Sequence, residues 1–193
     1  IALLSDHAIQ LMTDLLNAIE RGAPWPQHML QTRAVFLSKD ANSTDNPLAY
    51  RILKITSGWY RKWASCRNRE LADWVLTWDC KELNSGVPCK GAQDAWLNTA
   101  LQLELAQLSD QLVAGGSVDV YKCFDQINRD LVYSLAANAG MPLRILDPYF
   151  RYIDALQIRY QVGDSVGSEH LDRCSIPQGC PFSMMIIALP MRP

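Results

Sequence analysis

One carboxylate stands out in the sequence because its neighbours are apolar. Asp119 lies between Val118 and Val120 in a short strand-like stretch, residues 117–121. Burying an ionised carboxylate is costly unless a positive group answers it, and a bound divalent cation with oxygen ligands would do so. The sequence therefore indicates a metal ligand at Asp119.

A second carboxylate, Asp125, follows Asp119 at a distance of six residues. Along an extended strand this separation corresponds to roughly 20 Å, which is too far for the two carboxylates to share a pair of metal ions. We therefore expect Asp125 to have a structural role.

The basic residues are concentrated in one part of the chain. The net charge of the 193 residues is only −2, so the molecule as a whole offers no basic surface to nucleic acid. Between residues 51 and 69, however, no acidic residue occurs. The basic residues of this stretch are Arg51, Lys54, Arg61, Lys62, Arg67 and Arg69. Such a local cationic surface suits a phosphate backbone, and a solvated helix face is the equally open alternative.

Other kinds of chemistry lack their motifs. The three histidines lie far apart in the sequence, the six cysteines contain no C-x-x-C pair, and H-E-x-x-H, G-x-S-x-G, P-loop and G-x-G-x-x-G patterns do not occur. We expect free thiols in a reducing, intracellular compartment, either nucleus or cytoplasm. The sequence has no run of about 18 apolar residues, so we expect no membrane span. It also shows no charged-then-apolar leader, so we expect no signal peptide.

The first half of the chain predicts two helices around a hairpin. Apolar residues recur at helical spacing in residues 3–21. Residues 32–37 and 50–55 are typical of strands joined through the polar loop 41–47, which would place Lys39 and Arg51 near the inner ends of a hairpin.

A long helix over residues 57–78 follows the hairpin. Its tryptophans share one side at 3.6 residues per turn: Trp59, Trp63, Trp74 and Trp78. We expect this stripe to be buried in a core, with base stacking as the alternative.

The second half of the chain predicts further helices with one more hairpin. A helix over 93–113 has an apolar side that includes Leu101, Leu105 and Leu108, and Asn128 caps a helix that stops at Gly140. The remaining elements are a helix over 146–158, strands over 157–162 and 169–174, and a buried apolar helix over 182–189 started by Pro181. This pattern predicts an α+β fold in which helices pack on short antiparallel strands.

Three motifs, taken in order, resemble those of reverse transcriptases. S-V-D-V-Y-K-C-F-D-Q-I-N-R at 117–129 resembles the first catalytic palm motif, in the form closest to the non-LTR retrotransposon and group II intron branch. S-I-P-Q-G-C-P-F-S at 175–183 is similar to the next palm motif, and F-L-S-K-D with Y-R-I-L at 36–53 is similar to the finger hairpin. The resemblance covers nearly the whole chain.

The resemblance implies a division into two regions of a right-handed polymerase. Residues 1–114 would form fingers, and residues 115–193 would form the first part of the palm. The implied activity is RNA-templated DNA synthesis, with an RNA template, a DNA primer and deoxynucleoside triphosphates as partners. Two Mg²⁺ ions about 3.5–4 Å apart serve such nucleotidyl transfer, and the implied ligands are the Asp119 carboxylate and the Val120 carbonyl.

The same resemblance implies roles for the residues around the nucleotide. Lys39 and Arg51 would hold the triphosphate, as a point charge and a bidentate fork respectively. Phe124 would crowd the 2′ carbon of the sugar and so favour deoxynucleotides. Gln178 and Gly179 would shape the nucleotide and template pocket, with glycine allowing close approach of the backbone.

The chain departs from the family pattern at several positions. Ile52 stands where proline is usual, and Lys90-Gly91 replaces an arginine-rich turn. The Y-x-D-D hairpin and the thumb would lie downstream of Pro193, so we expect the chain by itself to be inactive as a polymerase.

Two other functions are weighed against this one. The first is a non-catalytic nucleic-acid-binding remnant of a mobile element, which would keep the cationic surface and would have lost polymerisation. The second, a viral RNA-dependent RNA polymerase, is disfavoured by Phe124, because that family usually carries an acidic residue there.

Overall fold

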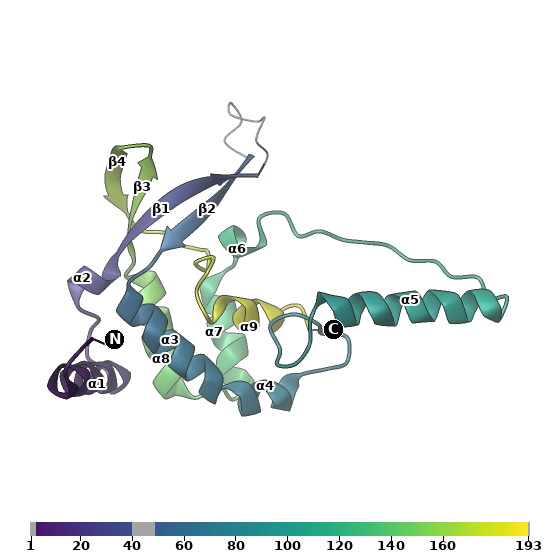
Figure 1. Cartoon of the computed structure of the whole chain (residues 1–193), viewed down its shortest axis with the longest axis horizontal. Helices are drawn as coiled ribbons and strands as arrows, with labels where there is room; N and C mark the ends of the chain where they lie inside the picture. Colours follow the sequence, from purple (N-terminus) through teal and green to yellow (C-terminus); the bar gives the residue numbers. More distant parts are fainter. Residues whose placement is uncertain (1–2, 40–48, 193) are drawn as a thin grey trace.

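The computed structural model describes residues 3–39 and 49–192 (Figure 1). The helices are α1 (Asp6–Glu20), α2 (Gln27–Leu30), α3 (Gly58–Glu70), α4 (Ala72–Trp78), α5 (Ala92–Leu108), α6 (Cys123–Gln126), α7 (Arg129–Asn138), α8 (Leu143–Asp154) and α9 (Ser183–Ala188). The strands are β1 (Gln31–Ser38), β2 (Tyr50–Ile55), β3 (Gln157–Val162) and β4 (Ser165–His170). This mixture confirms the α+β class. The predicted loop 41–47 lies outside the described residues.

The described strands form one mixed sheet in the order β2-β1-β3-β4. β1 and β2 pair antiparallel, with Leu37 opposite Arg51, which confirms the predicted pairing of these two strands. β1 and β3 pair in parallel, so the expectation of antiparallel strands alone was wrong.

The second hairpin is tighter than the sequence pattern suggested. β4 was predicted over 169–174 but occupies Ser165–His170. The reason is the turn: Gly163 has φ +56°, and Val162 already pairs with Ser165, so only two residues separate the strands.

An aromatic cluster holds the helices beneath the sheet. The Trp25 ring makes edge contacts with Tyr60, Trp63 and Tyr152 at centroid distances of 5.0–5.7 Å, and the Tyr60 and Tyr152 rings stack. The Trp25 indole donates a hydrogen bond of 2.8 Å to the Pro148 carbonyl, which satisfies its polar atom inside the core. α1, α3 and α8 thereby share one core.

The tryptophan stripe lies where the spacing predicted, although its helix is broken. Trp63, Trp74 and Trp78 are buried and Trp59 is half-buried, which confirms burial. The predicted single helix over 57–78 was wrong, because the chain ends α3 and starts α4 at Leu71. Leu71 has ψ −2° and a side chain that is 1% exposed, so the core contact redirects the helix.

α8 and α9 lie near their predicted positions. α8 runs from Leu143 to Asp154 instead of over 146–158, since it starts directly after Pro142 and β3 already begins at Gln157. α9 is mostly buried, as predicted for its apolar sequence. Gly86 packs against it with φ +74°, and a Cβ atom there would lie 2.3 Å from the Met184 carbonyl oxygen, so only glycine fits.

α5 differs most from the prediction. Its apolar side was expected to face the core, but Leu101, Leu105 and Leu108 are 53%, 66% and 86% exposed. Figure 1 shows α5 extending away from the other elements. Its apolar residues surround the helix instead of forming one stripe, and among the described residues only Ala106 on this helix is buried. No described helix is long and apolar enough to span a membrane.

Candidate functional site

Most of the predicted nucleotide-site residues line one cavity, hereafter the central cavity, of about 490 Å³. It lies between the β1–β2 hairpin, the segment that leads into α6, and the loop between β4 and α9. The predicted residues in its lining are Lys39, Arg51, Asp119, Val120, Phe124 and Gln178. Tyr50, Ile52, Tyr121, Lys122, Cys123 and Asp125 complete the lining.

The hairpin forms a cationic wall of the central cavity. Lys39 directly follows β1, and its backbone N–H donates to the Ala49 carbonyl at 2.8 Å, which closes the described end of the ladder. Arg51 lies on β2 and is exposed. Ammonium and guanidinium groups in one cavity suit an anionic ligand with several phosphate oxygens.

The opposite wall is formed by Phe124 and Gln178, which backbone hydrogen bonds bring together. The Ser175 N–H donates to the Ile127 carbonyl at 3.0 Å, and the Ile176 N–H donates to the Phe124 carbonyl at 2.9 Å. The loop of residues 171–182, which carries Gln178, is therefore laid against α6. Phe124 is half-buried: it packs on the core and also borders the cavity.

Gly179 is required by its backbone conformation. It has φ +86°, and a Cβ atom there would meet the nearest described side chain, Leu53, at an ordinary distance of 3.6 Å. The expectation that glycine permits a close approach of a ligand is not tested by these contacts, whereas the positive φ alone accounts for the residue type.

Asp119 lies in a different environment from the one that its neighbours suggested. Residues 111–120 have no regular secondary structure, Asp119 is exposed, and Val118 is 91% exposed. The predicted strand over 117–121 and the predicted burial were therefore wrong. Alternation of apolar residues buries a strand only where another strand or a helix covers it, and no described element covers this one.

Asp125 lies closer to Asp119 than an extended chain would allow. Lys122 has a left-handed backbone (φ +48°) and α6 begins directly after it, so the chain turns and both carboxylates border the central cavity. The distance for an extended strand therefore does not apply to these two residues. The structural role of Asp125 stays a prediction, and the contact of its carbonyl with the Cys174 thiol at 3.4 Å agrees with it.

The charge of Asp119 reaches the neighbouring helix. Burial raises the pKa of the Cys123 thiol, and the nearby Asp119 carboxylate raises it further. A cation bound at Asp119 would remove the second of these effects, so this thiol is a natural reporter of what occupies the site.

The carboxylates fit a magnesium ion only in part. Mg²⁺ is commonly held by one or two carboxylates together with substrate phosphates, and Asp119 and Asp125 supply oxygen atoms on the cavity that also contains the cationic wall. Within the described ranges, no group of three or more His, Cys, Asp or Glu side chains could hold a metal ion by itself. A metal ion here would therefore need further ligands besides these two carboxylates, such as water, a backbone carbonyl or phosphate oxygens.

The cationic stretch 51–69 divides into two groups. Arg61, Lys62 and Arg69 are exposed on α3, as a nucleic-acid-binding surface requires. Lys54 and Arg67 were expected in the same surface, and for them the expectation was wrong because acidic residues neutralise them. Asp172 and Glu20 come from distant parts of the chain, and Glu70 lies on α3 itself.

The two neutralised cations have different partners. Lys54 is buried against Asp172, and Arg67 pairs with Glu20 and Glu70. Burial alone would lower the pKa of Arg67, but the hydrogen bonds and charges of the two glutamates raise it overall. The side chain of Arg67 therefore has a structural role, in ion pairs with Glu20 and Glu70.

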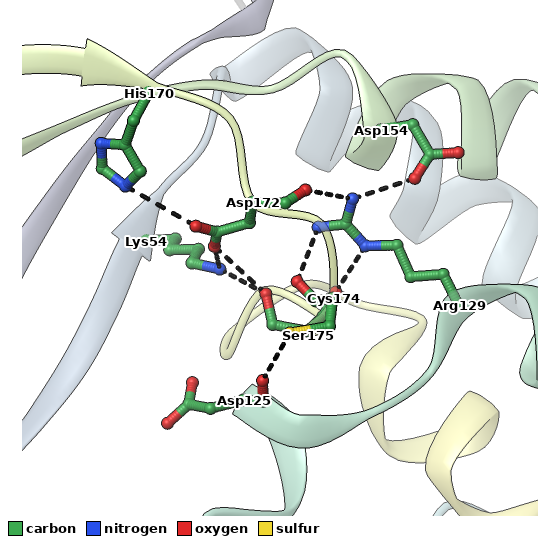
Figure 2. A network of polar contacts seen from close by, with 8 residues as sticks. All are labelled: Lys54, Asp125, Arg129, Asp154, His170, Asp172, Cys174 and Ser175. Atoms are coloured by element: carbon green, nitrogen blue, oxygen red, sulfur yellow. Dashed lines mark hydrogen bonds and ion pairs between the residues drawn. The ribbon is translucent and has the colours of Figure 1, made fainter.

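Sequence reasoning missed Arg129, which anchors the 171–182 loop (Figure 2). Its side chain is 5% exposed and donates to the carbonyls of Ser175 at 2.8 Å, Asp172 at 2.9 Å and Cys174 at 3.1 Å. It also pairs with Asp154 on α8 at 2.9 Å. Since these partners lie 25–46 residues away in sequence, no local pattern indicates them.

A second large cavity, of about 540 Å³, lies between α1, α7 and α8 and contains none of the predicted residues. Several of its charged side chains have structural partners. Arg151 donates to the carbonyls at the end of α1, and Asp147 accepts a hydrogen bond of 2.7 Å from Tyr133. The central cavity is the better candidate because residues of the three predicted motifs line it together.

Comparison with known proteins adds no assignment: no protein-family model matches the chain, and no curated protein matches it significantly. The candidate site therefore depends on the residues and their geometry.

Proposed function

We propose that this chain is the fingers and first palm region of a reverse transcriptase, and that the central cavity binds the incoming deoxynucleoside triphosphate. One observation carries the proposal. Lys39 and Arg51, Asp119 with Phe124, and Gln178 come from the three separate motifs, and all of them line the same cavity. A chance resemblance of short motifs would not require their side chains to converge.

Each wall of the cavity has a task in this proposal. Lys39 and Arg51 hold the phosphates through charge-assisted hydrogen bonds. Phe124 lies against the sugar and leaves no room for a 2′ hydroxyl, and Gln178 with Gly179 bounds the base and template side. Asp119, with the Val120 carbonyl, would hold Mg²⁺, which when bound neutralises charge on the transferring phosphoryl group.

The remaining regions follow from the same proposal. Residues 1–114 are the fingers and residues 115–193 are the partial palm of an intracellular polymerase. Arg61, Lys62 and Arg69 lie exposed on α3, where they can contact the phosphates of an RNA template or a DNA primer.

The second candidate is a non-catalytic nucleic-acid-binding remnant of a mobile element. The exposure of Asp119 on an irregular segment favours it, because a catalytic carboxylate needs a fixed position. Such a protein would bind RNA or DNA through α3 and would show no preference for deoxynucleotides.

Nucleotide binding by the chain itself separates the two candidates. We expect calorimetric titration with Mg²⁺ present to show binding of dATP, weaker binding of ATP, and loss of dATP binding in Arg51→Ala. The matched control is Arg33→Ala, an exposed arginine on β1 that does not line the central cavity. If the wild-type chain binds RNA but no dATP, the remnant is the correct function.

A further inference from the structure

Lys54 is a buried cation that does not line the central cavity. It lies on β2, its side chain is 5% exposed, and its ammonium group pairs with the Asp172 carboxylate and donates to the Ser175 hydroxyl at 2.7 Å (Figure 2). An unpaired charge at this depth would be strongly unfavourable. The contact between β2 and the 171–182 loop is therefore a required part of the fold.

The loop is held in a conformation that it would not adopt alone. Ser175 has φ +85°, which is unfavourable for a residue with a Cβ atom. Lys54 fixes its hydroxyl, Arg129 fixes its carbonyl, and the Ile127 carbonyl accepts from its N–H. Three separate elements thus hold one strained residue in place.

This contact links two walls of the central cavity. Arg51 is three residues before Lys54 on β2, and Gln178 is three residues after Ser175 in the loop. The next residue, Ile176, donates to the Phe124 carbonyl, so Phe124 is held by the same arrangement. The position of the cationic wall relative to Phe124 and Gln178 therefore depends on the contact of Lys54 with Asp172 and Ser175.

We propose that Lys54 is a positioning residue of the nucleotide site. It acts through Arg51 and Gln178 without touching the nucleotide, and it sets the distance between the group that holds the phosphates and the groups that bound the sugar and base. This role depends on the proposed function of the central cavity.

The test is Lys54→Met, which keeps most of the unbranched side chain and removes its charged end. We expect the Kd for dATP in the presence of Mg²⁺ to rise about tenfold or more, since small displacements of binding groups have large effects. Hydrogen exchange at the backbone amides of Ser175 and Ile176 should become faster in the same variant. Asp172→Asn should also raise the Kd for dATP. The double variant, Lys54→Met with Asp172→Asn, should have a Kd no higher than that of the single variant that binds dATP more weakly.

Two further variants keep the test interpretable. Lys54→Met combined with Asp172→Leu replaces the ion pair by apolar side chains, which preserves stability but not the hydrogen bond to Ser175, so dATP binding should stay weak. The matched control is Arg159→Met, which removes the more exposed pair with Glu169 from the same sheet and should change neither readout.

The outcomes distinguish this inference from the proposed function. Equal dATP binding by the wild type and by Lys54→Met overturns the positioning role and leaves the nucleotide site intact. Absence of dATP binding by the wild type overturns the proposed function, and the positioning role with it.

Discussion

Two walls of the central cavity differ in how they are held. Buried hydrogen bonds hold one wall in place, and the other wall is exposed to solvent. The wall of Phe124 and Gln178 is tied to α7 through Arg129 and to β2 through Lys54. The wall around Asp119 belongs to residues 111–120, which are exposed and make no regular secondary structure. The backbone segments that carry Phe124 and Gln178 are therefore held in place, whereas the segment that carries the Asp119 carboxylate is not.

This difference separates recognition from catalysis within one cavity. A pocket with fixed aromatic and amide groups can bind and discriminate a nucleotide before any reaction. Two-metal chemistry needs carboxylates held at defined positions. The chain should accordingly bind deoxynucleotides better than its exposed Asp119 would suggest.

Backbone protection should show the largest contrast between the two walls. We expect amides of residues 112–120 to exchange at nearly the rate of an unfolded chain, and those of Ser175 and Ile176 to be slower by a factor of about a thousand or more. Hydrogen exchange followed by mass spectrometry measures both. Similar protection in both regions would show that the two walls are equally fixed.

Arg129→Met should have the largest effect on stability. It removes the donor from the carbonyl oxygen of the buried Ser175 and from the less buried carbonyls of Asp172 and Cys174. One buried unsatisfied group costs about 1–3 kcal/mol, so we expect a loss in this range. Asp119→Ala should change the free energy of unfolding by less than about 0.5 kcal/mol, as for other exposed sites. Urea denaturation measures the free energy of unfolding of both variants. Equal losses of stability in the two variants would contradict the prediction.

The cations of α3 should matter for RNA and not for the nucleotide. Reversing the charge of Arg61, Lys62 and Arg69 should lower the salt dependence of single-stranded RNA binding by about 2 in the log–log slope. Arg67→Met, by contrast, should keep that slope and lower stability, because Arg67 pairs with Glu20 and Glu70. RNA binding measured at several salt concentrations gives this slope. An unchanged slope in the triple variant would contradict the proposal that the cations of α3 bind RNA.

Phe124→Val should produce a smaller and more specific change. A shorter side chain leaves room for a 2′ hydroxyl, so the preference for dATP over ATP should fall about tenfold. Phe150→Val is the control, since Phe150 packs on Tyr133 and Tyr149 and none of these three residues lines the central cavity. An unchanged preference would show that Phe124 belongs to the core alone.

The sequence pattern predicted those elements whose own residues determine their burial. The hairpin β1–β2, strand β3 and helix α9 have clear periods or continuous apolar runs, and they lie close to the expected positions. The resemblance named six nucleotide and metal residues besides Asp119. Five of them line the central cavity together with Asp119, and Gly179 does not.

Other features could not be predicted because they depend on distant partners. Burial of Val118 or Leu105 requires a neighbour that covers them, and neither has one among the described residues. Lys54 looked like a member of a cationic surface until Asp172, 118 residues later, was found beside it. Local sequence specifies the side chain, but only the fold specifies what neutralises it.

Primer extension on an RNA template tests the central claim most directly. The protein to be tested is a polypeptide that contains this segment and continues beyond Pro193. We expect Mg²⁺-dependent incorporation of deoxynucleotides that is lost in both Asp119→Ala and Arg51→Ala and kept in Arg33→Ala. Incorporation that survives Asp119→Ala and Arg51→Ala would contradict the assignment of the central cavity as the site of nucleotidyl transfer.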